Sequence, residues 1–300
     1  MRRLQPRLAV WGTVTLLALV FVFLGAGMDV EYVIPRRLTR LGAMVIGGVC
    51  IAWSSITFQT LTGNRILTPA IMGYEAVYLL LQALLVLFLG TSSVVLLGIH
   101  GNFLLSVVVM LAYSWGIHRW LFRDGNSNVY TLLLVGLVLT LVIGTFTQFV
   151  QLKVSPGEFS VLQSFSLASF NRVQPPQLLY GALVVAAVAL VGRKSLATLD
   201  VLSLGRDQAI SLGVDYRHSV RLHLALIAAL VAVSTSLLGP TAFMGIFVAN
   251  STYALARTFR HRVTLALGSA VAIGLFIAAQ LLVEHVFNYT TTVGILINLL

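Results

Sequence analysis

The sequence predicts an all-α membrane protein, a polytopic bundle of about ten transmembrane helices with a short polar loop between two of them. Hydrophobic residues make up 58% of the 300 residues, charged residues make up 9%, and the mean hydropathy is +0.97. Soluble domains carry about 25% charged residues. In addition, apolar stretches near the length of about 20 residues that a spanning helix needs follow one another with short polar breaks. We therefore expect one transmembrane domain over residues 1–300.

The apolar stretches define the expected spans in order along the chain. They lie at 8–24, 38–61, 69–90, 94–117, 129–150, 178–191, 222–238, 242–256 and 263–283, and a tenth begins at 291. The first stretch is longer than the apolar core of a signal peptide, about 7–15 residues, and no clean cleavage site follows it, so we expect a retained helix. A partial helix is expected at 159–170. The last span is expected to continue beyond residue 300.

The positive charges indicate the orientation of the chain rather than a nucleic-acid partner. The formal net charge is +10, but the Arg residues are scattered singly between apolar runs. With the N-terminus in the cytoplasm, fourteen of the 19 Arg and Lys residues fall on the cytoplasmic side, as the positive-inside rule requires. This orientation predicts a multi-pass membrane protein, surrounded by lipid, with its N-terminus and the polar loop at about 197–218 in the cytoplasm.

Catalytic and metal-binding patterns are absent from the sequence. The segment Gly192-Arg193-Lys194-Ser195 ends like a phosphate-binding loop but lacks the upstream glycine. His218 and His223 are five residues apart, so a helix would place them on different faces. We expect no enzyme activity, no metal site and no cofactor. Any energy for work would have to come from a partner chain or a gradient.

Two features in the spans are candidates for a solute pathway. In the fifth span, small and polar residues recur at three- and four-residue spacing and so share one helix face: Gly136, Thr140, Gly144, Thr147 and Gln151. This face could line a polar path, or it could allow close helix packing. Glu75 is the acidic residue nearest a span interior, which makes it a functional candidate. Its position six residues after Pro69 places it close to the cytoplasmic surface, where capping or an interhelical hydrogen bond is the alternative role.

Four segments together carry a resemblance to a known family. Residues 37–40 (RLTR) are similar to an R-x-P-R pattern at the start of the second helix, and residues 59–69 are similar to a turn with an N-P-L-A-x-P core. Residues 204–214 (LGRDQAISLGV) are similar to L-G-x-x-x-A-x-x-L-G-V, and residues 239–246 (GPTAFMGI) to G-P-I-x-F-V-G-L. In this order, the segments resemble those of the permeases of iron-chelate and cobalamin importers, which are driven by ATP-binding cassette proteins.

The resemblance implies a specific role for the polar loop. It is the element that couples the permease to an ATPase, and the implied contact residues are Gly205, Arg206, Asp207, Gln208, Ala209, Ser211, Leu212 and Gly213. A short helix there could dock in a groove and transmit rigid-body motion to the adjoining spans. Leu202, Leu212 and Val214 would offer apolar contacts. The alternative is an inert surface loop.

The resemblance also implies a docking site for an external binding protein. Arg37 and Arg40 lie three residues apart on one helical side, where family members pair arginines with glutamates of the binding protein. The alternative is an ordinary pair of interfacial arginines. A third arginine that the family often has before the last helix is absent here, and the corresponding region carries Glu284. The docking surface is therefore expected to differ in part.

The cytoplasmic turn with Asn64, Pro69 and Glu75 resembles the subgroup that imports ferric siderophores. The resemblance implies a second permease subunit, a paralogue or an identical copy, together with two ATP-binding cassette subunits and a siderophore-binding protein. The substrate that the resemblance implies is a ferric siderophore, a catecholate or a mixed chelate, carried across a bacterial inner membrane. Import of cobalamin or haem by the same fold, a gradient-driven secondary transporter and a polytopic membrane enzyme are the alternatives.

Overall fold

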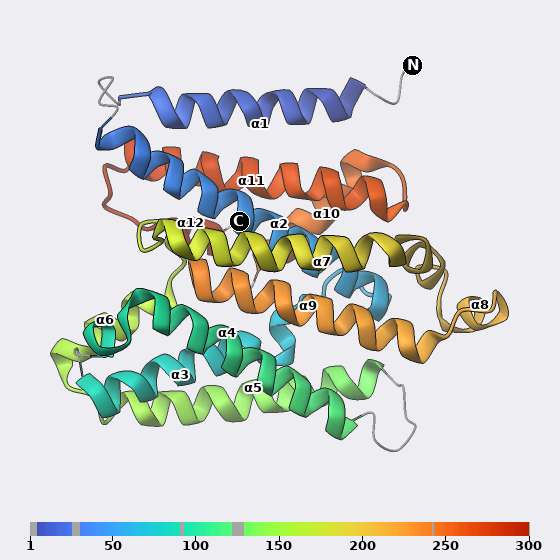
Figure 1. Cartoon of the computed structure of the whole chain (residues 1–300), viewed down its shortest axis with the longest axis horizontal. Helices are drawn as coiled ribbons and strands as arrows, with labels where there is room; N and C mark the ends of the chain where they lie inside the picture. Colours follow the sequence, from blue (N-terminus) through green and yellow to red (C-terminus); the bar gives the residue numbers. More distant parts are fainter. Residues whose placement is uncertain (1–4, 26–30, 91–92, 122–128, 242, 300) are drawn as a thin grey trace.

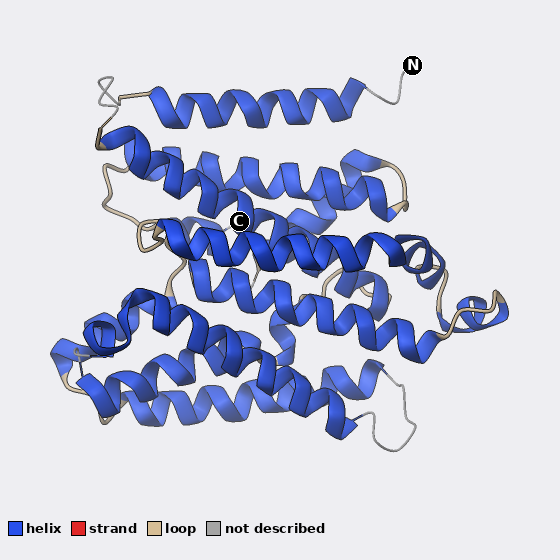
Figure 2. Cartoon of the chain, in the orientation of Figure 1, coloured by secondary structure: helices blue, strands red, loops and turns tan. Residues whose placement is uncertain are grey.

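The computed structural model describes residues 5–25, 31–90, 93–121, 129–241 and 243–299. Within these ranges the chain forms helices and connecting loops and no strand (Figure 2). The basic segment at 1–4 and the polar loop at 122–128 lie outside them. The elements are α1 (Gln5–Phe23), α2 (Val33–Thr62), η1 (Pro69–Met72), α3 (Tyr74–Leu89), α4 (Ser93–Leu121), α5 (Val129–Gln151), α6 (Pro156–Ser166), α7 (Pro175–Leu202), α8 (Arg206–Ser211), α9 (Tyr216–Leu238), α10 (Met244–Ala256), α11 (His261–His285) and α12 (Val293–Leu299).

The long helices lie side by side, with their ends gathered at two opposite faces (Figure 1). One face carries α8 beyond the ends of α7 and α9, and we call it the α8 end. The other carries α6, and we call it the α6 end. Six described helices are long and apolar enough to cross a membrane, and α1, α3 and α10 are shorter apolar helices. The predicted polytopic helical bundle is confirmed.

The core is built around α2, which contacts α11, α9, α7 and α10. Small residues let these helices approach closely, as expected for packing in a bilayer. A Cβ added at Gly47 would clash with Leu238 of α9, and one at Gly48 would come within 3.1 Å of the backbone nitrogen of Ile273 in α11. By contrast, α5 and α7 present most of their apolar side chains outward.

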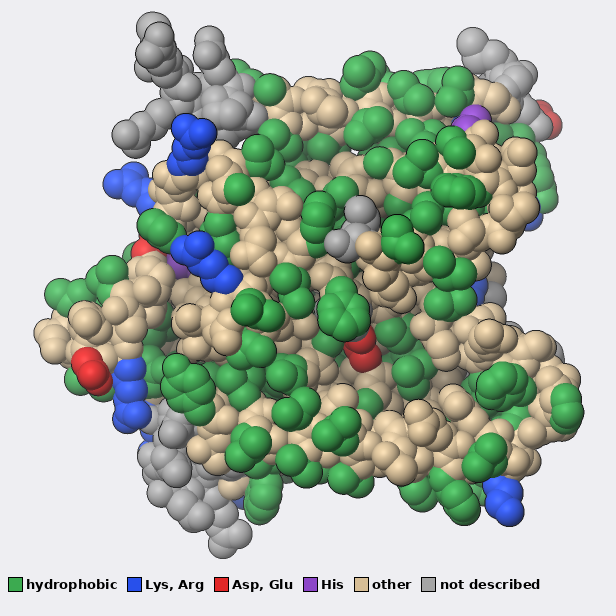
Figure 3. Space-filling view, turned by 180° about the vertical axis from the view of Figure 1, so that it is seen from behind, with side chains coloured by type: hydrophobic (Ala, Val, Ile, Leu, Met, Phe, Trp, Pro, Cys, Tyr) green, Lys and Arg blue, Asp and Glu red, His purple; other side chains and the backbone are tan. Residues whose placement is uncertain are grey.

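The space-filling view is consistent with a protein surrounded by lipid. In Figure 3, hydrophobic side chains cover the middle of the face, and Lys and Arg side chains lie toward the two ends. This is the distribution expected where an apolar band meets the hydrocarbon core and charged groups stay at the water interfaces.

Two expected boundaries differ from the structure. The sixth span does not end at Arg193 and Lys194, because α7 continues as helix to Leu202. Charged residues end the part of a helix that can lie in lipid, but Arg and Lys are good helix formers and do not end the helix itself. The polar loop is therefore shorter than 197–218, since its first six residues belong to α7 and α9 begins at Tyr216.

The third expected span is interrupted rather than continuous. η1 ends at Gly73, whose φ of +86° is left-handed, and α3 begins at Tyr74. Glycine adopts this conformation at little cost. Only 16 residues of α3 remain, or about 24 Å at 1.5 Å per residue.

Candidate functional site

The polar loop forms a short helix that protrudes at the α8 end (Figure 1). Two glycines with left-handed φ values bracket α8, Gly205 at +101° and Gly213 at +82°. Inside the turn, the side chain of Ala209 is fully buried and its carbonyl accepts a hydrogen bond from the backbone N–H of Val214. Asp215 then accepts a hydrogen bond from the N–H of His218 and caps α9. The loop thus has a defined conformation.

The outward surface of α8 combines apolar and charged side chains. Leu204, Ile210 and Leu212 are 56%, 50% and 63% exposed, and Arg206, Asp207 and Gln208 are exposed beside them. Of the three apolar contacts expected from sequence, only Leu212 is available, since Leu202 is buried and Val214 packs against the core. Leu204 and Ile210 replace them. Exposed apolar side chains on an element that protrudes from the bundle mark a binding surface.

The base of this surface is tied to the core through a pair that sequence reasoning missed. Asp200, in the last turns of α7, accepts a hydrogen bond from the backbone N–H of His261 at 2.7 Å and contacts its ring Nδ1 at 2.6 Å. The other ring nitrogen lies 2.8 Å from Oγ1 of Thr60 in α2. The three side chains therefore join the ends of α7, α11 and α2. Asp200 lies 61 residues before His261 and 140 residues after Thr60, so no sequence spacing indicated the contact.

At the α6 end, the two arginines predicted to dock a binding protein pair within the chain. Arg40 donates to Glu284 at 3.1 Å, and a nitrogen of Arg37 lies 3.7 Å from the same carboxylate. Arg37 also donates to the backbone carbonyls of Phe21 and Leu24 at the end of α1, both at 2.6 Å. Glu284 is only 4% exposed. This group of residues, which we call the Arg–Glu cluster, ties α1, α2 and α11 together.

Glu284 is also the residue at which the sequence departs from the family's docking pattern. Gln280 donates a hydrogen bond to its carboxylate at 2.6 Å. Arg37, Arg40 and Gln280 therefore fix the position of the Glu284 carboxylate, and that carboxylate neutralises part of the charge of the two arginines. Arg36, next to the cluster, is exposed and stacks over the ring of Tyr32 at 4.1 Å.

A cavity of about 690 Å³ opens beside the Arg–Glu cluster. Its polar lining includes Arg36, Arg40 and Arg172, and its aromatic lining includes Phe165 and Phe170. Arg172 donates from Nη2 to the carbonyls of Leu167 and Leu238, while Nη1 is buried without a hydrogen-bond partner among the described residues. Burial lowers the pKa of this guanidinium, and the nearby Tyr78 raises it. The volume is within the range of about 300–1,000 Å³ that is typical of ligand pockets.

The polar stripe of the fifth span packs within the subunit for much of its length. A Cβ at Gly136 would lie 2.9 Å from Cα of Met72, and Thr140 donates to the carbonyl of Ile71 at 3.1 Å. Thr147 is buried and donates to its own helix. At Gly136, Thr140 and Thr147 the stripe therefore serves close packing rather than a polar path, because this part of α5 packs against η1 or within its own helix. Gly144 and Gln151 are half-buried, and the space beside Gly144 is open.

The turn predicted to be cytoplasmic, residues 63–69, leads back into the bundle, because η1 and α3 follow it directly. Asn64 caps the turn by accepting from the N–H of Ile66 at 2.9 Å. Pro69 is buried. The carbonyl of Ile71 accepts a hydrogen bond from the Thr140 hydroxyl, and the carbonyl of Met72 accepts one from the Tyr113 hydroxyl at 2.9 Å. Non-helical backbone at membrane depth is tolerated only where the protein satisfies it in this way.

Glu75 lies near the middle of the bundle and not close to the cytoplasmic surface as expected. Its carboxylate accepts a hydrogen bond from the backbone N–H of Thr241 at 2.9 Å, just before α10. α3 runs from this point to the α6 end, and α10, about 20 Å long, runs to the α8 end. The sequence position misleads because residues 63–73 climb into the bundle. The observed hydrogen bond joins α3 to the loop before α10, so it links two segments of the bundle as the alternative role requires, although its donor is not in a helix.

Among the described residues, no three His, Cys, Asp or Glu side chains come together in an arrangement that could hold a metal ion. The functional features are instead the protruding α8 surface, the paired arginines, the adjacent cavity and the interrupted helices.

Comparisons with known proteins agree with these features. The model of the FecCD transport family matches residues 9–300. The petrobactin import system permease protein YclO of Bacillus subtilis (strain 168) is 34% identical over 279 residues, covering 93% of this chain and 88% of that protein. The petrobactin import system permease protein FatC of Bacillus anthracis is 34% identical over 270 residues, covering 89% and 75%.

A solved structure extends the similarity to the fold. It is described as an inward-facing conformation of a metal-chelate type ABC transporter, and it matches with a TM-score of 0.82 and 17% identity, covering 98% of this chain and 95% of that one. The family match spans nearly the whole chain and two relatives exceed 30% identity. The chain therefore belongs to the FecCD transport family, whose members are permease subunits of ABC transporters and not enzymes.

Proposed function

We propose that this chain is the permease subunit of an ATP-driven importer that carries a ferric siderophore across a bacterial inner membrane. The observation that carries the proposal is the similarity to two petrobactin import permeases over most of the chain. The sequence resemblance implies a catecholate or mixed chelate, and we propose the catecholate type. The chain would act with a second permease subunit, two ATP-binding cassette subunits and an external siderophore-binding protein.

The proposed orientation puts the α8 end and the N-terminus in the cytoplasm. Most of the described Arg and Lys residues support it, because the helix ends and loops that carry them lie at or near the α8 end. The described exceptions lie at the α6 end and are Arg36, Arg37, Arg40, Lys153 and Arg172. A cytoplasmic ATPase would then meet α8 first. The apolar side chains of Leu204, Ile210 and Leu212 would be buried in that contact, each contributing about 1.5–3 kcal/mol if fully covered.

The chemistry of the cavity at the α6 end supports an anionic, aromatic cargo. In a ferric complex of a catechol siderophore, the deprotonated oxygens outnumber the charge of the iron, so the complex is an anion with aromatic faces. Arg36, Arg40 and Arg172 would attract the anion, and Phe165 and Phe170 would contact the rings. Arginine suits this task because its guanidinium is always charged and can also stack on rings.

Reconstitution tests the proposed energy source. The permease, assembled with its ATPase and partner permease in vesicles, should take up the ferric siderophore from a loaded binding protein only when ATP is supplied. Uptake that persists without ATP, and that stops when a proton or sodium gradient is collapsed, would favour the secondary transporter instead. Omitting the binding protein provides the control for passive leak.

Docking of the binding protein can be tested separately. Arg36 is exposed, whereas Arg37 and Arg40 share Glu284. Arg36→Glu should weaken association with the binding protein in a salt-dependent manner. Arg37→Glu combined with Arg40→Glu should weaken it further if these two charges also take part, as the family resemblance implies. Unchanged affinity in both variants would argue against docking on this surface.

A further inference from the structure

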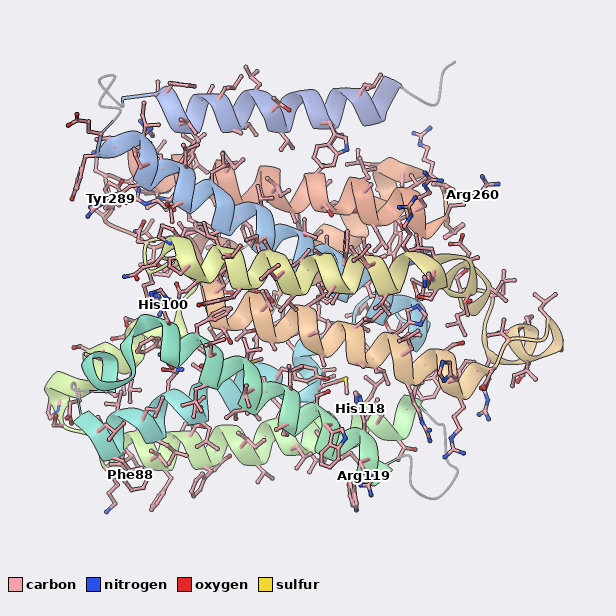
Figure 4. All side chains as sticks on the ribbon, in the orientation of Figure 1. Phe88, His100, His118, Arg119, Arg260 and Tyr289 are labelled. Carbon is pink, nitrogen blue, oxygen red and sulfur yellow. The ribbon has the colours of Figure 1, made fainter. Side chains whose placement is uncertain are left out.

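A groove with an unusual lining lies on the side of the bundle, away from both α8 and the cavity at the α6 end. It runs between the second half of α4 and the first half of α9 and has a volume of about 940 Å³. Figure 4 labels His118 and Arg119 in this part of α4, near the α8 end. Small residues, Gly116 and Ala225, leave its surface hollow, and both are exposed.

The side chains around the groove have the chemistry of a membrane interface. Trp115 and Trp120 are 66% and 65% exposed. Tryptophan is enriched where the hydrocarbon core meets the headgroups, because the ring is apolar and its N–H is polar. Leu111, one turn deeper along α4, is also exposed and continues the lining toward the middle of the bundle. The groove therefore changes from polar to apolar along its length.

Two guanidinium groups approach the groove from its two walls. Arg119 extends from α4 and stacks against Trp115 at 5.6 Å, and Arg221 extends from α9. Both residues are exposed. Among the described residues that line the groove, none carries a carboxylate. The polar end of the groove is therefore positively charged, next to an apolar trough.

We propose that this groove binds an anionic phospholipid of the leaflet at the α8 end. The phosphate would lie between Arg119 and Arg221, and an acyl chain would follow Leu111, Gly116 and Ala225. Basic pockets between membrane helices at the cytoplasmic side bind anionic headgroups for this reason. The lateral position favours a lipid over the ATPase, since α8 protrudes beyond the helix ends and the groove faces sideways. The inference does not depend on the identity of the transported cargo.

Lipid retention measures the proposal directly. The permease, assembled with its partners, is exchanged into mixed micelles with phosphatidylglycerol or phosphatidylcholine of the same acyl chains, and bound lipid is counted by native mass spectrometry. The wild type should retain phosphatidylglycerol with at least tenfold higher affinity. Arg119→Gln with Arg221→Gln should reduce this preference to threefold or less. Arg119→Lys should preserve most of it, because a phosphate needs the charge more than the guanidinium fork.

A matched control removes the same charge at the same end of the bundle. Arg193 and Lys194 are exposed on α7 and do not line the groove. Arg193→Gln with Lys194→Gln should keep the tenfold preference, and equal thermal unfolding of all variants would show that they fold. Equal loss in both double variants, or no preference in the wild type, would overturn the proposal. So would retention by the isolated subunit but not by the assembled complex, since a partner chain would then cover the groove.

Discussion

At the scale of single residues, the structure gives small side chains different roles within one helix. Gly136 and Gly144 are two turns apart in α5 and belong to the same stripe. Gly136 meets the backbone of Met72, whereas nothing lies within 4 Å of a Cβ added at Gly144. Both glycines lie on the same face of α5, so the sequence spacing cannot tell them apart. They differ because η1 packs against Gly136 and not against Gly144.

A pair of identical substitutions exploits this difference. Gly136→Ala should destabilise the protein by about 1–3 kcal/mol, because the new methyl group forces η1 away from α5. Gly144→Ala is the control and should be neutral or stabilising by up to about 1 kcal/mol, since alanine is the better helix former. Thermal unfolding of the purified variants measures both. Equal melting temperatures would contradict the tight contact at Gly136.

The Arg–Glu cluster permits a second residue-level prediction. Glu284→Gln removes the carboxylate that pairs with Arg37 and Arg40. The side chain of Glu284 is only 4% exposed, so water cannot readily replace it. The expected loss of stability is about 2 kcal/mol, the size of a hydrogen bond to a charged group. Glu31→Gln, an exposed acidic residue at the same end, is the control and should change the melting temperature little. A melting temperature of the Glu284 variant equal to that of the control would show that the cluster contributes nothing.

At the scale of elements, α8 combines rigidity with an apolar surface. Its ends are fixed by Gly205 and Gly213, and its inner face by the buried Ala209. A helix of six residues would not persist in isolation, because helix nucleation is costly. The tertiary contacts therefore hold the surface ready for a partner.

Charged substitutions should separate this surface from the fold. Ile210→Asp with Leu212→Asp should reduce co-purification of the ATPase at least tenfold, because two apolar contacts become charged groups that must be desolvated. Leu152→Asp changes a leucine that is even more exposed (82%) and lies at the opposite end, and it should leave ATPase co-purification unchanged. Normal ATPase binding in the double variant would place the contact elsewhere on the α8 end.

The elements also show what sequence could and could not predict. Apolar length located nearly every helix, because the bilayer imposes it directly. The interruption at Gly73 was missed, since residues 69–90 read as one apolar stretch although the chain re-enters the bundle there. The pattern at residues 204–214 located α8. It could not show that Leu202 is buried while Leu204 and Leu212 are exposed, because that depends on how the loop packs against the core. Asp200 and His261 could not be paired from sequence because no periodicity connects residues on separate helices.

At the scale of the whole molecule, the contact between Asp200, His261 and Thr60 joins the end of α7 that leads into α8 to the ends of two central helices, α11 and α2. α7 is otherwise exposed along much of its length, so this link connects the residues before α8 with α11 and, through Thr60, with α2. A motion imposed on α8 would therefore reach two of the central helices. Rigid elements joined in this way can transmit movement between distant sites.

Removing this link should uncouple ATP hydrolysis from uptake. Asp200→Ala deletes the acceptor for the N–H and ring of His261, and ATP-driven uptake in vesicles should fall at least fivefold while the ATPase still co-purifies. Asp200→Asn keeps an acceptor oxygen and should restore most of the uptake. If the alanine variant transports at the normal rate per ATP hydrolysed, the motion must take another route.

The interrupted helices have a mechanical consequence for the molecule as a whole. α3 is confined to the half of the bundle at the α6 end, and α10 to the half at the α8 end, and Glu75 and Thr241 meet where they begin. A continuous helix resists bending because every turn is braced by the next. Two half-length helices can tilt about their shared junction without breaking a backbone hydrogen bond inside either one. The bundle therefore has a junction at mid-depth, held by the hydrogen bond between Glu75 and Thr241, where no continuous helix braces its two halves.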